Sequence, residues 1–210
     1  MSSYLTIARD AEAEIEVKRS RFRATLARVE SEDDARAVVA RLRREHWDAR
    51  HHCTAYVLGP AGALERSNDD GEPAGTAGAP MLEVLRGQGV SDVVAVVTRW
   101  FGGTLLGAGG LVRAYGDAVR AGLDAAGTRR RDLLREHLLD LDHVDAGRVE
   151  GELRHRGVAV LDSSYGSAVT LRLAVPPDRE EWLAGLVAEL TGGAGTTRPA
   201  GERWVDSLDP

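Results

Sequence analysis

The sequence has few of the residues that mark secreted or membrane-bound proteins. Cys53 is the only cysteine among 210 residues, which excludes an intrachain disulfide and suits a reducing compartment. No apolar run approaches the ~20 residues needed to span a bilayer. The start, MSSYLTIARDAEAEIEVK, does not have the charged and apolar regions of a secretory signal. We therefore expect a cytoplasmic protein that does not bind membranes.

The sequence also has fewer basic residues than acidic ones, 27 against 33. The formal net charge is -6, so the chain is a poor candidate for broad, phosphate-driven binding of nucleic acid, although a local basic patch could still bind RNA. Lys18 is the only lysine, and the arginines that make up the other basic residues suit bidentate phosphate contacts. Apolar residues at 43% and charged residues at 29% indicate a globular protein rather than a disordered or fibrous one.

The pattern of apolar residues predicts two domains of the α+β class, over residues 1–127 and 128–210. In the first, alternation and apolar runs predict strands. Helical spacing predicts an amphipathic helix over residues 32–46, with Ser31 at its start. The expected strands lie around Ile15–Val17, Phe22–Arg28, His51–Gly59, Leu64 and Val93–Val97. The last of them is typical of a strand buried on both faces.

The second domain has helix-sized and strand-sized pieces but no concentrated motif. Its expected order is β-α-β-β-α-β, the ferredoxin-like arrangement, with a hairpin turn at Tyr165–Ser167. The six elements are expected near 133–143, 145–156, 158–163, 168–175, 177–190 and 196–205. We expect a binding or packing module here rather than catalysis.

A loop of unusual composition covers residues 68–80, NDDGEPAGTAGAP. Its glycines permit tight conformations and its prolines restrict them, so we expect a structured loop. Pro80 is expected to open a short helix over Met81–Arg86. Asp69, Asp70 and Glu72 could hold a hard cation or supply a general base. No metal-binding spacing accompanies them, so capping of the turn by the aspartates is the favoured interpretation, and no metal or other cofactor is expected.

The strongest feature is VVAVVTRWFGGTLLGAGGLVRAYGDAV, in which a buried strand enters a glycine-rich bend and a helix follows. Free N–H groups at a helix start favour an anion such as phosphate, and Arg99 and Arg113 flank the bend. Neither a P-loop nor the G-x-G-x-x-G fingerprint is present. The glycines could instead serve only close packing of helix on sheet, and both interpretations stay open.

Two further groups of residues invite a functional interpretation. His51, His52 and Cys53 do not make a zinc site, because the lone cysteine has no paired partner and a strand points His52 away from the other two. A lone cysteine usually packs as a small hydrophobe, whereas His52 facing the loop could bind a carboxylate or phosphate. The aromatic residues Trp47, Trp100, Phe101 and Tyr115 could stack on bases, although such residues are more often part of a core.

Four segments together resemble the YigZ/IMPACT family. They are SRF (20–22), ARHHCTAYVLG (49–59), NDDGEPAGTAGAPML (68–82) and VVTRWFGGTLLGAGGLVRAYGDA (96–118). The resemblance implies an N-terminal domain with the β-α sandwich fold of elongation factor G domain IV, a small-subunit ribosomal protein and the galactokinase group. Residues 133–206 resemble a ferredoxin-like domain of elongation factor G. Where the family commonly has a lysine in FGGxKLG, this chain has Leu105 and Leu106, which weakens the phosphate interpretation.

The resemblance implies a role connected with translation. Eukaryotic relatives act in translational control by binding an activator of the kinase that senses amino-acid starvation. Those relatives carry a further domain, so this partner role does not transfer directly. For this chain we expect a non-enzymatic protein that binds RNA, the ribosome or a translation factor. The alternatives are an enzyme acting on a phosphate-bearing or peptide-like small molecule, and a protein-interaction scaffold. The expected contact surface comprises His52, Asp69, Asp70, Gly71, Glu72, Pro73, Gly75, Thr76, Arg99, Trp100, Phe101, Gly102, Gly103, Gly107, Gly109, Gly110 and Arg113.

Overall fold

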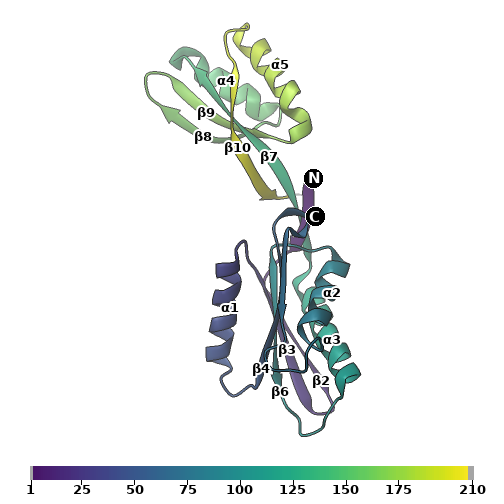
Figure 1. The fold of residues 1–210 in the computed structure, drawn as a ribbon. Coiled ribbons are helices and arrows are strands. Elements are labelled where there is room, and N and C mark those ends of the chain that lie inside the picture. The colour runs from purple at the N-terminus through teal and green to yellow at the C-terminus, as the bar shows by residue number, and fades with distance from the viewer. Residues whose placement is uncertain (1, 208–210) are drawn as a thin grey trace. The chain divides into compact units, whose positions relative to one another are not determined.

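The computed structural model describes residues 2–207 and confirms the predicted α+β class, with two sheets and five α-helices in that range (Figure 1). The described residues form two compact units, one over residues 3–130 and the other mainly over 131–207. Within the described residues, none of the helices is long and apolar enough to cross a membrane.

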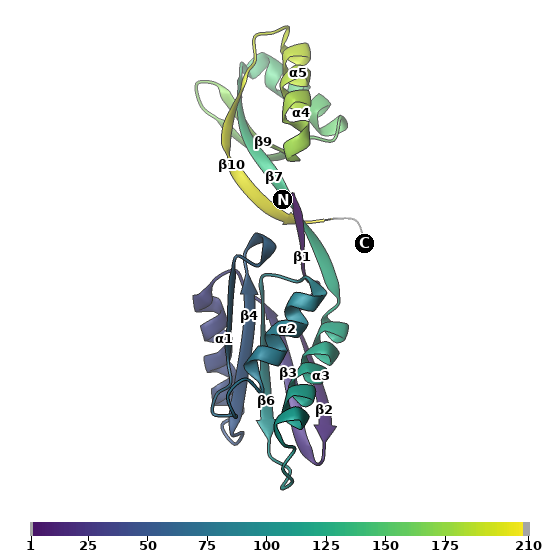
Figure 2. The same ribbon diagram turned by 45° about the vertical axis from the view of Figure 1, so that its right-hand side comes forward.

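The first unit is built on an antiparallel sheet with the strand order β2-β3-β6-β4-β5. The helix α1 covers one face of this sheet, and α2 and α3 cover the other (Figures 1 and 2). The elements are β1 (Ser3–Ile7), β2 (Ala11–Val17), β3 (Ser20–Arg28), α1 (Glu32–Glu45), β4 (His51–Leu58), β5 (Leu64–Asn68), α2 (Gly78–Gln88), β6 (Val93–Trp100) and α3 (Ala108–Ala126).

The central strand β6 is buried on both faces, as its β-branched run predicts. Val93, Ala95 and Val97 belong to the core under α2 and α3, whereas Val94 and Val96 belong to the core under α1. This alternation decides which side chains of β6 can meet each helix layer. It therefore also decides where the polar residues at the end of the strand point.

The start of α2 differs from the sequence prediction. The helix begins at Gly78 rather than at Met81, so Pro80 is its third residue and not its first. The reason is a cap supplied from the preceding loop, where the Asp69 carboxylate accepts the N–H groups of Ala77 and Gly78. The N–H that Pro80 lacks is one that the first turn of a helix leaves unpaired in any case.

The second unit has the predicted β-α-β-β-α-β order. Its strands pair antiparallel in the order β10-β7-β9-β8, and the apolar sides of α4 and α5 share one core with the sheet. This is the ferredoxin-like arrangement. The strand β7 begins five residues earlier than predicted, at Thr128. The elements are β7 (Thr128–Leu141), α4 (His143–His155), β8 (Ala159–Tyr165), β9 (Val169–Val175), α5 (Glu180–Thr191) and β10 (Thr197–Asp206).

Candidate functional site

The two aspartates of the 68–80 loop are used by backbone donors. The Asp69 carboxylate accepts N–H groups from Gly75, Ala77 and Gly78 at 2.8, 3.0 and 2.7 Å. Burial would raise the pKa of Asp69, but these three donors together outweigh burial and hold that pKa below its ordinary value. Asp70 accepts the backbone N–H of His52 at 2.7 Å. The capping interpretation therefore fits Asp69, whereas the Asp70 side chain instead ties the loop to β4 and to Arg43 of α1. No cluster of potential metal ligands occurs among residues 2–207.

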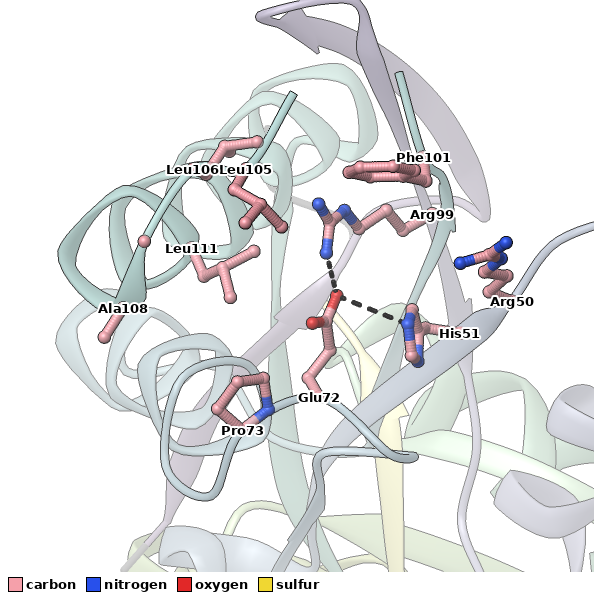
Figure 3. Close-up of a pocket in the computed structure, with 11 residues that line it drawn as sticks. Arg50, His51, Glu72, Pro73, Arg99, Phe101, Leu105, Leu106, Ala108 and Leu111 are labelled. Carbon is pink, nitrogen blue, oxygen red and sulfur yellow. Dashed lines mark hydrogen bonds and ion pairs between the residues drawn. The ribbon is translucent and has the colours of Figure 1, made fainter. Parts of the chain in front are cut away.

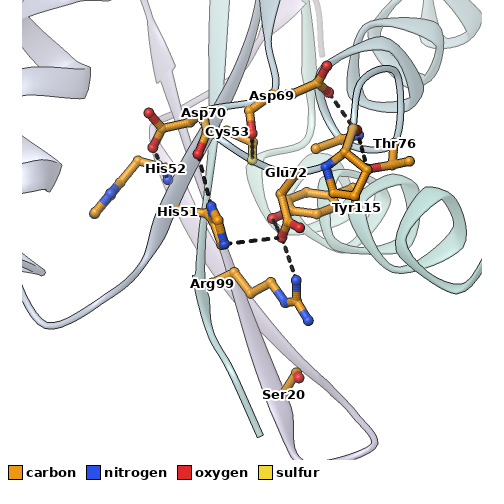
Figure 4. Close-up of polar contacts among 12 residues, drawn as sticks. Ser20, His51, His52, Cys53, Asp69, Asp70, Glu72, Thr76, Arg99 and Tyr115 are labelled. Atoms are coloured by element: carbon orange, nitrogen blue, oxygen red, sulfur yellow. Dashed lines mark hydrogen bonds and ion pairs between the residues drawn. The ribbon is translucent and has the colours of Figure 1, made fainter. Parts of the chain in front are cut away.

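Glu72 is the carboxylate of the loop that turns inward. Its side chain is 4% exposed, and Oε1 accepts the Nη1–H of Arg99 at 2.5 Å and the hydroxyl of Tyr115 at 2.7 Å (Figure 4). Burial is the main cause that raises the pKa of Tyr115, with Cys53 and Glu72 adding to it, so the phenol stays protonated and donates. A buried carboxylate with two donors is a satisfied group that holds the arginine in one orientation.

His51 lies beside this pair, and each of its ring nitrogens faces an oxygen that can accept. Its Nδ1 is 2.9 Å from the carbonyl oxygen of Asp70, and its Nε2 is 4.0 Å from Oε1 of Glu72. A carbonyl can only accept, so Nδ1 carries a proton. In the neutral ring Nε2 is therefore an acceptor, and it faces the glutamate (Figure 4).

His52 does not join this group, contrary to the expectation that it faces the loop. Strand alternation points its ring to the face covered by α1, where it is 5% exposed, and only its backbone reaches Asp70. Burial lowers the pKa of His52, so its ring stays neutral. Cys53 is buried, and its Sγ donates to the Asp69 carbonyl at 3.0 Å. Burial raises the pKa of Cys53 to about 12, so it is a packed thiol rather than a nucleophile.

A cavity of 420 Å³ opens beside Glu72 and Arg99 (Figure 3). Five of its lining residues were expected at the site: Glu72, Pro73, Arg99, Phe101 and Gly107. Ala108 and Leu111 lie inside the expected stretch Gly107–Arg113, and four lining residues were missed: Arg50, His51, Leu105 and Leu106. His51 enters the site through the strand pairing, because it is the direct partner of Arg99 in the sheet, and local sequence periodicity gives no signal for that contact.

Other expected residues lie elsewhere in the first unit. Arg113 and Gly75 line a separate hollow on α2 and α3, so Arg99 and Arg113 do not flank one phosphate-binding surface. Trp100 points to the opposite sheet face from Arg99, and its Nε1–H donates to Asp48 at 2.9 Å. Tyr115 is fully buried and belongs to the core.

The glycines of the bend serve two different purposes. A Cβ on Gly102 would lie 2.1 Å from the backbone carbon of Arg19, so close packing requires a glycine there. Gly107 has a φ of 73°, caps α3 and lines the cavity. The packing interpretation therefore applies at Gly102, whereas anion binding at the start of α3 stays a prediction.

Arginines and aromatic residues also gather where β3 begins and β6 ends, and two of them, Arg50 and Phe101, line the cavity as well. The guanidinium carbon of Arg21 lies 4.6 Å from the ring centre of Trp100, and that of Arg50 lies 5.8 Å from the ring centre of Phe101. Trp47 is 82% exposed and Phe101 is 41% exposed. We call this group the arginine–aromatic tip; it comprises Arg19, Arg21, Arg23, Trp47, Arg50, Trp100 and Phe101.

Glu14, Glu16 and Asp48 are acidic neighbours of this tip, and Glu16 is the direct cross-strand partner of Arg21. Glu14 pairs with Arg23 at 2.9 Å and lies 3.9 Å from Arg21, while Asp48 accepts from Trp100. Arg19 donates to the hydroxyl of Thr104 at 3.2 Å. That hydroxyl is neutral, so this contact does not compensate the positive charge of Arg19. The tip therefore keeps an excess of positive charge on an acidic protein.

Comparison with known proteins identifies both units. Residues 18–123 match the Impact N-terminal domain, and residues 139–194 match a domain of unknown function (DUF1949). The chain is 40% identical to IMPACT family member YvyE of Bacillus subtilis over 92% of this chain and 89% of that protein. It is 39% identical to IMPACT family member YigZ of Escherichia coli over 92% of this chain and 96% of that protein.

A eukaryotic relative and a solved structure agree with these matches. Protein IMPACT of Rattus norvegicus is 38% identical over 45% of this chain and 31% of its own length. A crystal structure described as that of a hypothetical protein has a TM-score of 0.69 and 39% identity, and the match covers 94% of this chain and 97% of that one. The predicted resemblance is confirmed, and the chain belongs to the IMPACT family.

Proposed function

We propose that this protein is a translation-associated regulatory protein that binds RNA, free or on the ribosome, through the arginine–aromatic tip. Two observations outside the tip support a connection with translation. The relatives include eukaryotic proteins named IMPACT, and the sequence resemblance implies that both units are similar to modules of a translation factor. The observation that carries the proposal is the grouping of arginines with Trp47, Trp100 and Phe101 at the end of the sheet where β3 begins and β6 ends.

The chemistry of the tip suits a single-stranded segment. Bases stack on aromatic rings for about 1–3 kcal/mol each, whatever their sequence, and arginines contact the phosphates. The net charge of -6 works against non-specific binding over the whole surface, so affinity has to come from this local patch. The Arg21–Trp100 and Arg50–Phe101 contacts hold the guanidinium groups beside the rings before any ligand arrives.

Co-sedimentation with ribosomes and their subunits at increasing salt, together with binding of a labelled single-stranded RNA, tests the proposal. We expect salt-sensitive binding that the double variant Arg19→Gln/Arg21→Gln weakens, with a salt slope smaller by about 2. Neither of these residues lines the cavity. The matched control is Arg36→Gln/Arg120→Gln, which removes the same charge from exposed helix positions that pair with nearby acids.

A stacking variant separates ring contacts from charge. Trp47→Ala leaves the charge unchanged and should weaken RNA binding by about 1–3 kcal/mol with no change in the salt slope. Binding that is equal in the wild type, the double arginine variant and Trp47→Ala would show that the tip is not the RNA-binding surface. Absence of pelleting and of RNA binding at any salt would reject the function itself.

A further inference from the structure

We propose that the cavity beside Arg99 is a binding site for a small carboxylate that carries an apolar body. The proposal goes beyond RNA binding and does not rest on it, because the groups that carry it are not part of the arginine–aromatic tip. They are the guanidinium of Arg99, the first turn of α3 and the leucines of the bend. Figure 3 shows these groups around one open space.

Arg99 has hydrogen-bonding capacity that the protein does not use. The residue is 6% exposed, and Nη1 donates to Glu72, but no residue in the described range accepts from its buried Nε. An unsatisfied buried donor costs about 1–3 kcal/mol. The edge of a guanidinium formed by Nε and Nη2 matches the two oxygens of a carboxylate. Because the buried Nε has almost no exposed surface, a bound carboxylate would meet the guanidinium first at Nη2.

The surroundings hold this guanidinium rigidly. Its central carbon lies 5.3 Å from the ring centre of Phe22 and 5.8 Å from that of Phe101. Glu72 fixes Nη1 and is itself fixed by the hydroxyl of Tyr115. Because the protein alone orients the arginine, a ligand would not have to order a flexible side chain, and it would lose less entropy on binding.

The charge of the cavity favours an anion. Arg50 and Arg99 both line it, whereas Glu72 is the one carboxylate among its lining residues. The 19-residue helix α3 begins at Ala108 on the cavity wall, and its first turn contains no acidic residue. The partial positive charge of a helix start adds to the attraction for an anionic group.

The remaining walls favour an apolar body rather than a phosphate alone. Leu105, Leu106, Leu111 and Pro73 cover the side opposite the polar groups. The volume of 420 Å³ is in the range of small-molecule sites, which have mostly apolar walls and a few orienting polar groups. A carboxylate with a short branched hydrocarbon chain uses both halves of the cavity, whereas inorganic phosphate leaves the leucines in contact with water.

The test is nuclear magnetic resonance of the ¹⁵N-labelled full chain, titrated with 4-methylpentanoate. We expect shifts at the Arg99 Nε–H and at the backbone amides of residues 107–111, with saturation in the millimolar range. The uncharged 4-methylpentanamide has the same shape and should bind at least tenfold more weakly. Inorganic phosphate should also bind at least tenfold more weakly, which separates carboxylate recognition from a general anion site.

Two matched variants place the ligand without disturbing Arg99. Ala108→Leu puts a larger side chain into the cavity at an exposed helix position and should weaken 4-methylpentanoate binding at least tenfold. Ala37→Leu adds the same atoms at an exposed position of α1, away from the cavity, and should change nothing. The proposal is overturned if the carboxylate causes no shifts in these groups up to 20 mM, a concentration chosen for a ligand of ~mM affinity. Equal binding of amide and carboxylate, or equal binding by both variants, would overturn it as well.

Discussion

The carboxylate of Asp69 accepts the N–H of Gly78 at 2.7 Å, so the cap of α2 comes from a residue nine positions earlier in the chain. The same carboxylate also holds Gly75 and Ala77. The loop between β5 and α2 is thereby closed on itself around one charged group. This closure positions Glu72, which lies between the two ends of the loop and points into the cavity.

Asp69→Asn should destabilise the protein by about 1–3 kcal/mol at pH 7, because an amide cannot accept from three donors as a carboxylate does. The folded-state pKa of Asp69 is lowered, so its stabilisation is complete above the unfolded value of about 3.9 and disappears as the pH falls through the folded value. Urea unfolding should therefore show a difference in the free energy of unfolding between wild type and variant, and this difference should be smaller at pH 2.5 than at pH 7.

The control for this prediction is Asp117→Asn, which removes an exposed carboxylate that pairs with Arg120 on α3. It should change stability by less than about 0.5 kcal/mol at either pH. A loss at Asp69 no larger than the loss at Asp117 would contradict the capping role.

Gly102→Ala should be strongly destabilising, by more than about 3 kcal/mol, because the new Cβ would lie within 2.3 Å of three backbone atoms of Arg19 and Ser20. Gly87→Ala is the opposite case, since no atom other than its chain neighbours and the nearby helix backbone lies within 4 Å of the added Cβ in the exposed part of α2. It should stabilise by about 0.5–1 kcal/mol through helix propensity. Thermal unfolding of both variants checks the pair, and similar effects of the two would contradict the packing argument.

Tyr115→Phe should lower the free energy of unfolding by about 1.5–3 kcal/mol, because the buried Glu72 carboxylate loses a hydrogen-bond donor while the ring stays in place. The ring itself packs edge-on against Phe22, with the ring centres 5.2 Å apart, so the core should not collapse. Guanidinium unfolding provides the measurement. Tyr165→Phe, at a position 70% exposed, is the matched control and should leave stability unchanged.

Cys53 should resist alkylation in the native protein. It is fully buried, and burial raises its pKa to about 12, so almost no accessible thiolate exists at pH 8. Iodoacetamide followed by mass spectrometry should show no labelling of the native chain over hours. Complete labelling should appear once urea unfolds it. Rapid labelling without denaturant would indicate that the strand β4 opens frequently.

Local patterns in the sequence determined most of the secondary structure. The β-branched run of β6 and the Ser31 cap of α1 were predicted from residues next to one another, and both are found in the structure. The period of two along β4 is likewise enough to separate His52 from its two neighbours. Such predictions succeed because the physical causes act within four residues along the chain.

Only the tertiary structure decided which functional groups meet. Glu72 binds Arg99, which is 27 residues later, and Tyr115, which is 43 residues later. The pairing of β4 with β6 brings His51 beside Arg99. Local periodicity contains no information about such partners, because their distance depends on the path of the chain through the whole sheet. For the same reason the sequence suggested Arg99 and Arg113 as one surface, while the fold buries the first and places the second on another hollow.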